Sequence, residues 1–246
     1  MIKKILLLLI TVNLFAYTPL ELAKQYDKIT SGFKSSIATM TMILINEAGQ
    51  KIERKLTIKT LEGKKDEDKT LLTFLTPADI KGTKLLTYNH LKKSDSQWIY
   101  LPALKRTKRI SSSNKSGSFM GSEFSYEDIA NNSYKKYSYN DTIEVKNNLF
   151  KTIRVPKDRN SGYSKQIVYQ DKKSFLVKKI EYYDRKKELL KTAIFDDYKK
   201  IKAVWRVGKM SMTNHQNGKK TILIWKDEKI KTGLKDRNFH KRVLKK

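Results

Sequence analysis

The chain has 246 residues, and 53 Lys or Arg against 25 Asp or Glu give it a formal net charge of +28. Its 39% hydrophobic content excludes intrinsic disorder, and ten glycines with four prolines exclude a low-complexity or collagen-like chain. The absence of cysteine excludes disulfides, thiolate metal sites and cysteine nucleophiles. The basic residues are 44 lysines and nine arginines spread along the sequence, whereas specific nucleic-acid recognition relies on arginine forks. A solvated lysine-rich surface is therefore favoured, ahead of a surface attracted to anionic lipid.

The first 16 residues have the layout of a secretory signal peptide. Lys3 and Lys4 precede the apolar stretch 5–15, and Ala16 is a candidate for the small residue at a cleavage site. Eleven residues are fewer than the roughly 20 that a membrane-spanning helix needs, so an uncleaved anchor is the less favoured alternative. We expect residues 1–16 to be removed on export and 17–246 to form one soluble domain outside the cytoplasm.

The mature chain opens with a predicted helix and continues as strands. Residues 19–29 place Leu22, Tyr26 and Ile29 on one helical face, and Pro19 suits a first turn. Beyond residue 35 the apolar residues alternate with polar ones, and Asn217-Gly218 is a strong hairpin signal because both residues tolerate positive φ. Strands are predicted at 37–45, 51–59, 70–75, 83–88, 97–101, 105–110, 134–139, 143–145, 152–155, 165–170, 176–183, 190–198, 209–213 and 221–225.

These elements predict a mainly β (α+β) fold, in which a single strongly curved antiparallel sheet carries a few short helices. The alternation lapses between residues 111 and 132, where a polar serine-rich loop is followed by irregularly spaced aromatic residues. A loop of this length inside a compact domain is usually functional or mobile. We interpret 111–132 as a movable element at the mouth of a cavity.

Motifs of enzymatic chemistry are absent from the sequence. It contains no phosphate-binding loop, no dinucleotide glycine fingerprint, no zincin motif and no Gly-x-Ser-x-Gly. The carboxylate pairs Asp196-Asp197 and Glu127-Asp128 are interpreted as solvated groups at turns or strand edges. We therefore expect no enzyme, no cofactor and no metal site.

Apolar residues are in excess on strand faces that are expected to be exposed to solvent, notably the methionines of 37–45. Methionine and aromatic side chains suit a cavity that accepts flexible acyl chains, although an ordinary packed core is the alternative. The candidate cavity residues are Met40, Met42, Leu44, Leu56, Ile58, Leu72, Phe74, Trp98, Tyr100, Phe119, Phe124, Tyr182, Met210, Met212, Leu223 and Trp225.

A basic segment follows the fifth predicted strand. Lys105 and Arg109 would share one face of a strand, and Arg106 and Lys108 the other. It is either a charged hairpin rim or a contact at the cavity mouth for anionic lipid headgroups or an acidic partner protein.

Several segments resemble the LolA-like outer-membrane lipoprotein-sorting family. They are Gly82-Thr-Lys-Leu-Leu86, Gln97-Trp-Ile-Tyr-Leu-Pro-Ala-Leu-Lys-Arg106 and Gly117-Ser-Phe-Met-Gly-Ser-Glu-Phe-Ser-Tyr-Glu-Asp128, although the family usually has Asp where Glu123 stands. The resemblance implies a half-open barrel plugged by short helices, and a non-enzymatic periplasmic carrier of acyl chains of lipids or lipoproteins. It implies transfer of the cargo toward the outer membrane. The expected partners are an inner-membrane transporter (RND-type or a sorting complex) and an outer-membrane acceptor. Contact with the membrane would be transient, and nucleic acid is not an expected partner.

In an alternative interpretation, the protein has the same fold but carries no cargo. The protein would then be an envelope interaction or sensor module that partners an RND-type exporter or a stress regulator. We expect a charged residue at Met40 or Met42 to separate the two hypotheses. Loss of lipid with intact partner binding favours the carrier, and intact function favours the module.

Overall fold

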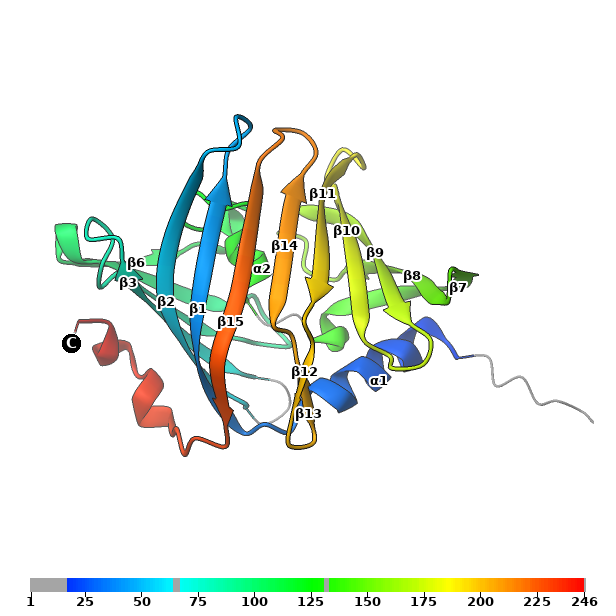
Figure 1. Ribbon diagram of the computed structural model, residues 1–246, viewed down its shortest axis with the longest axis horizontal. Coiled ribbons are helices and arrows are strands. Elements are labelled where there is room, and N and C mark those ends of the chain that lie inside the picture. Colours follow the sequence, from blue (N-terminus) through cyan, green and yellow to red (C-terminus); the bar gives the residue numbers. More distant parts are fainter. Residues whose placement is uncertain (1–16, 64–66, 131–132, 246) are drawn as a thin grey trace, which may run out of the picture.

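The computed structural model describes residues 17–63, 67–130 and 133–245 (Figure 1). The predicted signal peptide, 1–16, lies outside the described residues. The predicted first helix is confirmed as α1 (Pro19–Thr30). It starts at a capping box in which Glu21 N–H donates to Thr18 Oγ1 (3.2 Å) and Thr18 N–H donates to Glu21 Oε2 (2.7 Å). In the described part of the chain, no helix is long and apolar enough to cross a membrane.

A 13-stranded antiparallel sheet makes up most of the domain, in the order β6-β5-β4-β3-β2-β1-β15-β14-β11-β10-β9-β8-β7. Its first half comprises β1 (Ser35–Ile45), β2 (Lys51–Leu61), β3 (Lys69–Thr76), β4 (Lys84–Tyr88), β5 (Ser96–Leu101) and β6 (Arg106–Ile110). Its second half comprises β7 (Tyr137–Lys146), β8 (Leu149–Pro156), β9 (Tyr163–Asp171), β10 (Val177–Asp184), β11 (Leu189–Asp196), β14 (Lys209–Asn214) and β15 (Lys220–Ile230).

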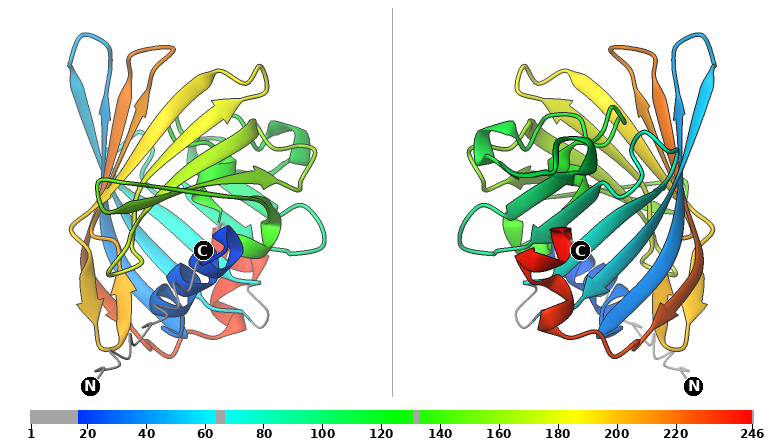
Figure 2. Two further views of the ribbon diagram at one scale, coloured as in Figure 1. Left: turned by 90° about the vertical axis from the view of Figure 1, so that its right-hand side faces the viewer. Right: turned by 90° about the vertical axis from the view of Figure 1, so that its left-hand side faces the viewer.

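The two halves join where β1 pairs with β15, which places the first and last strands in the middle of the sheet. The outer strands β6 and β7 come from the middle of the chain and do not pair with each other. The sheet bends around an interior but remains open (Figure 2). The predicted fold class, a strongly curved sheet forming a half-open barrel, is confirmed.

Helices enter the open interior from two directions. Helix α1 contacts β7, the short strand β13 (Val204–Arg206) and the 3-10 turn η4 (Tyr134–Lys136). It therefore spans between the sheet edge and the hairpin that β13 forms with β12 (Lys199–Ile201). Gln170 Nε2 donates to Leu22 O (3.0 Å), which ties the helix to β9. The segment between β6 and β7 carries η3 (Ser112–Asn114) and α2 (Tyr126–Ile129).

Some elements differ from the sequence prediction. Residues 134–136 form η4, and the two strands predicted at 134–139 and 143–145 are one strand, β7, with an irregular register after Tyr139. The hairpin β12 (Lys199–Ile201) and β13 was missed because three-residue strands carry too little alternation. The hairpin at Asn217-Gly218 is confirmed, but only Gly218 has a positive φ, of 66°.

The register of the sheet separates an inner from an outer face. Ile58, Leu72, Leu85 and Ile99 lie in register on the concave face of β2 to β5. A second row in register, Leu71, Leu86 and Trp98, faces the convex side. The apolar residues on both faces of these strands therefore face two different hydrophobic clusters.

The C-terminal segment explains the outer cluster. The turns η5 (Asp236–Phe239) and η6 (Lys241–Lys245) lie on the convex side against β3, β4 and β5, and the short turn η2 (Pro102–Leu104) follows β5. Phe239 and Leu244 are fully buried there, and Lys241 Nζ lies 4.2 Å from the centroid of the Trp98 ring. The assignment of Trp98 and Tyr100 to the cavity is therefore wrong, because both pack beneath this segment.

We predict that Phe239→Ala lowers the free energy of unfolding by about 3–5 kcal/mol, because it leaves a hole between η5 and the sheet. Denaturant unfolding followed by fluorescence measures the change. Leu104→Ala is the control, since Leu104 is 55% exposed and its loss should cost about 0.5 kcal/mol or less. Equal stability of the Phe239 variant and the wild type would contradict the assigned packing.

Candidate functional site

A cavity of about 370 Å³ lies on the concave side of the sheet, between α1, residues 124–130 and 133–134, and the inner faces of the strands. This volume falls within the range of roughly 300–1,000 Å³ that is typical of small-molecule sites. Its apolar lining includes Pro19, Ala23, Phe33, Ile58, Phe124, Ile129, Val168, Val177, Ile180, Phe195, Val207, Met210, Met212 and Trp225.

Six of the predicted cavity residues line it: Ile58, Phe124, Tyr182, Met210, Met212 and Trp225. The other candidates on the concave face lie in the solid core beside the cavity, without contributing to its lining. They are Met40, Met42, Leu44, Leu56, Leu72, Phe74, Phe119 and Leu223.

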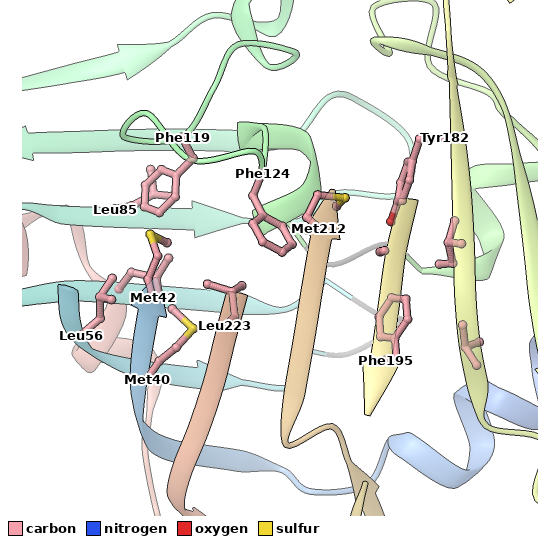
Figure 3. Close-up of a cluster of buried hydrophobic side chains, with 14 of the residues drawn as sticks. Met40, Met42, Leu56, Leu85, Phe119, Phe124, Tyr182, Phe195, Met212 and Leu223 are labelled. Carbon is pink, nitrogen blue, oxygen red and sulfur yellow. The ribbon is translucent and has the colours of Figure 1, made fainter. Parts of the chain in front are cut away.

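The segment that begins after β6 fills the end of the barrel where these eight candidates lie. It explains why they are packed in the core. Figure 3 shows Phe119 beside Leu85 and Phe124 near Met212 and Leu223. Met40 and Met42 are 1% and 0% exposed. A charged residue at either position would be buried without a partner, so the substitutions at Met40 or Met42 would test folding rather than cargo binding.

Sequence reasoning missed most of the wall made by α1 and by β9 to β11, of which it named only Tyr182. Ala23 and Tyr26 lie on the apolar face of the predicted helix, and Val177 and Ile180 lie in a strand that was predicted. The alternation in 176–183 could have identified Ile180 and Tyr182 as one face. The alternation could not show that this face meets α1, which lies about 150 residues earlier in the chain.

The segment 117–130 is fastened to the sheet by polar contacts. Glu123 N–H donates to Thr221 Oγ1 (3.0 Å), and Asn214 Nδ2 donates to Glu123 Oε2 (2.7 Å). Lys191 Nζ donates to Glu123 O (2.9 Å). The segment is thus part of the folded interior, and the predicted mobility of 111–132, of which 131 and 132 lie outside the described residues, stays a prediction.

A buried ion pair lies at the centre of these contacts. Lys191 Nζ is 2.6 Å from Asp128 Oδ2, and the two side chains are 5% and 4% exposed. Asp128 also accepts from Tyr163 OH (2.8 Å) and from Ser125 N–H (2.7 Å). The interpretation of Glu127-Asp128 as solvated carboxylates is therefore wrong, because partners far along the chain enclose both groups.

Glu127 occupies a second enclosed site. Its carboxylate accepts from Ser161 Oγ (2.6 Å) and from Gly162 N–H (2.9 Å), with Lys115 Nζ at 3.8 Å. Burial raises the pKa of Glu127, and the charge of Lys115 opposes that rise. Both carboxylates serve to fix the segment that forms one wall of the cavity.

The remaining polar groups of the cavity are mostly paired. Arg206 Nη2 lies 2.8 Å from Glu228 Oε1, and the guanidinium lies 4.3 Å from the Phe33 ring centroid. Tyr139 OH donates to Tyr134 O (2.9 Å), and burial raises the pKa of Tyr26. Neutral tyrosines and the Arg206–Glu228 pair leave most of the lining suited to a largely apolar ligand.

The predicted basic contact is elsewhere. Arg106, Lys108 and Arg109 are exposed on the edge strand β6, and Lys105 precedes it with a φ of 47°. No residue of 102–110 lines the cavity, so this segment is not part of the cavity mouth. An acidic partner for it stays a prediction.

Comparison with known proteins gives close matches to solved structures. A Vibrio parahaemolyticus domain described as outer membrane lipoprotein-sorting is 47% identical, with a TM-score of 0.88 over 92% of this chain and 98% of that one. A DUF1329 family protein from Desulfovibrio piger is 30% identical, with a TM-score of 0.85 over 92% and 97%. A LolA superfamily protein from Nitrosomonas europaea, 19% identical, shares the fold, with a TM-score of 0.74 over 93% and 100%.

Residues 66–246 match a protein family described only as uncharacterized. No curated protein matches the sequence.

We predict that Lys191→Met lowers the free energy of unfolding by about 3–5 kcal/mol, because it leaves the Asp128 carboxylate buried without a counter-charge. The double variant Lys191→Met/Asp128→Asn should recover much of that loss. Lys151→Met is the matched control, since Lys151 pairs with Glu144 at the surface and should cost about 1 kcal/mol or less. Equal losses for the two lysine variants, measured by denaturant unfolding, would refute the buried pair.

Proposed function

The chain belongs to the LolA-like outer-membrane lipoprotein-sorting family, and from that premise we propose that it is a periplasmic carrier of acyl chains. The cargo would be a lipid or the lipid part of a lipoprotein, held in the cavity on the concave face and transferred toward the outer membrane. The name of the Vibrio parahaemolyticus relative supports the sorting pathway. The apolar cavity is the observation that carries the proposal.

The driving force would be the removal of hydrocarbon from water. Each buried methylene is worth about 0.8 kcal/mol, so a dozen methylenes provide about 10 kcal/mol before the costs of binding. Met210 and Met212 suit such a ligand because thioether side chains adjust to different chain positions at little cost. Binding of this kind needs no covalent step.

The entry route would run past α1. This helix is one wall of the cavity, and among the described residues its neighbours β7, β13 and η4 are elements at the margin of the sheet. The opposite wall, the segment 117–130, is fixed by the buried Lys191–Asp128 pair. Displacement of α1 would therefore leave the buried Lys191–Asp128 pair intact.

A non-enzymatic role fits the polar groups near the cavity. Lys191, Asp128 and Tyr163 form the most buried ionic cluster there, and each is engaged by the others. Such a cluster supports a structural role. We propose that release of cargo occurs by handover to a membrane partner, such as an inner-membrane transporter or an outer-membrane acceptor.

We predict that Met210→Trp weakens the binding of a saturated fatty acid at least about tenfold, because the indole occupies part of the cavity. Ile43→Trp is the control, since Ile43 lies on the opposite face of β1 from Met42 and does not line the cavity. Calorimetric titration measures affinity, and mass spectrometry of the denatured protein detects lipid that co-purifies.

A wild-type protein that carries no lipid and binds no fatty acid would contradict the carrier. If Met210→Trp lost lipid but retained its pathway function in cells, the interaction-module alternative would replace it.

A further inference from the structure

A row of polar side chains crosses the concave face of the second half of the sheet. Cross-strand register aligns Tyr139 of β7 with Arg154 of β8, Arg154 with Gln166 of β9, Gln166 with Tyr182 of β10, and Tyr182 with Lys191 of β11. Residues in direct register lie on one face of a sheet. Arg154 and Tyr182 line the cavity.

The next row toward α1 is largely apolar. It aligns Thr152, Val168, Ile180, Ala193 and Met212 across β8 to β14. An amphiphile in the cavity would therefore meet a polar row beside an apolar one.

Arg154 differs from the other cations at the cavity because no carboxylate neutralises it. Lys191 has Asp128, and Arg206 has Glu228. Among the described residues, no ion pair joins Arg154 to a carboxylate. Its Nε donates to Gln166 Oε1 (2.8 Å).

The guanidinium is held in a fixed orientation. It lies 4.1 Å from the centroid of the Tyr137 ring, which is 5% exposed. Tyr139 lies beside it in register and donates its hydroxyl proton to Tyr134 O (2.9 Å). Burial raises the pKa of Tyr139 to about 12, so the neighbouring phenol is neutral and does not supply the missing negative charge.

We propose that Arg154 binds the anionic headgroup of the cargo, a carboxylate or a phosphate, while the acyl chain lies along the apolar lining. The inference rests on the proposed function and adds the class of headgroup and its position. A guanidinium suits either anion, because its planar donors match two oxygens at once. Stacking on Tyr137 and the bond to Gln166 orient the guanidinium before the ligand arrives, which reduces the cost of ordering it.

The test compares three ligands of equal chain length: dodecanoate, dodecyl phosphate and dodecanol. Each is titrated calorimetrically, below its aggregation concentration, into the lipid-stripped full-length protein. We expect the wild type to bind at least one of the two anions about tenfold or more tightly than dodecanol. A higher affinity for dodecanoate assigns a fatty-acid carboxylate, and a higher affinity for dodecyl phosphate assigns a phosphate headgroup.

Arg154→Gln should abolish the preference for the anion while leaving the affinity for dodecanol within about twofold. Arg109→Gln is the matched control, because Arg109 is exposed on β6 and should retain the preference. Arg154→Lys keeps the positive charge but lacks the planar guanidinium, whose donors match two oxygens at once. If Arg154→Gln does not fold, a folded Arg154→Lys with a weakened preference supports the assignment, and one with an unchanged preference overturns the assigned bidentate contact.

Two results separate this inference from the proposed function. If the wild type binds dodecanol and the anions equally, or if Arg154→Gln retains the preference, the headgroup site is wrong and the carrier stands. If none of the three ligands binds, the carrier itself fails, and the headgroup site fails with it.

Discussion

The structure depends on one constraint: a wide, curved sheet with an apolar inner face must be covered. Strands β1 to β5 meet this constraint on the inner side with Phe119 and Phe124, which the segment after β6 inserts against their methionine and leucine side chains. The inner face of the second half is covered by α1 and by the end of the segment 117–130, which leave part of it uncovered. The cavity is the part of the inner face that these elements do not fill.

An electrostatic interaction also contributes to the difference between the half with the solid core and the half with the cavity. The Lys191–Asp128 pair lies where the segment 117–130 meets β11, and it orients that segment through hydrogen bonds to Ser125 and Glu123. A pair of this kind contributes little net stability, but the loss of one member is costly. It therefore fixes the boundary between the solid core and the cavity.

Much of the fold was predictable from local pattern. The alternation of residues 51–59 or 165–170 indicates a strand whatever lies elsewhere, and the capping box of Thr18 and Glu21 marks the start of α1 locally. The site was less predictable, because membership of the cavity depends on what covers each face. Met40 and Met212 have the same character in sequence, yet Met40 packs in the solid core and Met212 reaches the cavity.

Long-range partners account for the remaining errors. Trp98 was assigned to the inside because nothing in its own strand indicates that Phe239 and Leu244 cover the convex face. Asp128 was interpreted as solvated because its counter-charge, Lys191, lies 63 residues away. Nothing in the sequence distinguishes Arg154 from the many other basic residues. Only the cross-strand register places it beside the cavity.

If the cavity is the place where an acyl chain binds, the side chains that line it must respond to the ligand. The most direct measurement is a methyl NMR titration of the methionine-labelled protein with a saturated fatty acid, since Met210 and Met212 line the cavity and Met120 does not. We expect the methyl signals of Met210 and Met212 to shift with saturation while that of Met120 moves least. Signals of Met210 and Met212 that stay unchanged while the fatty acid binds would contradict it.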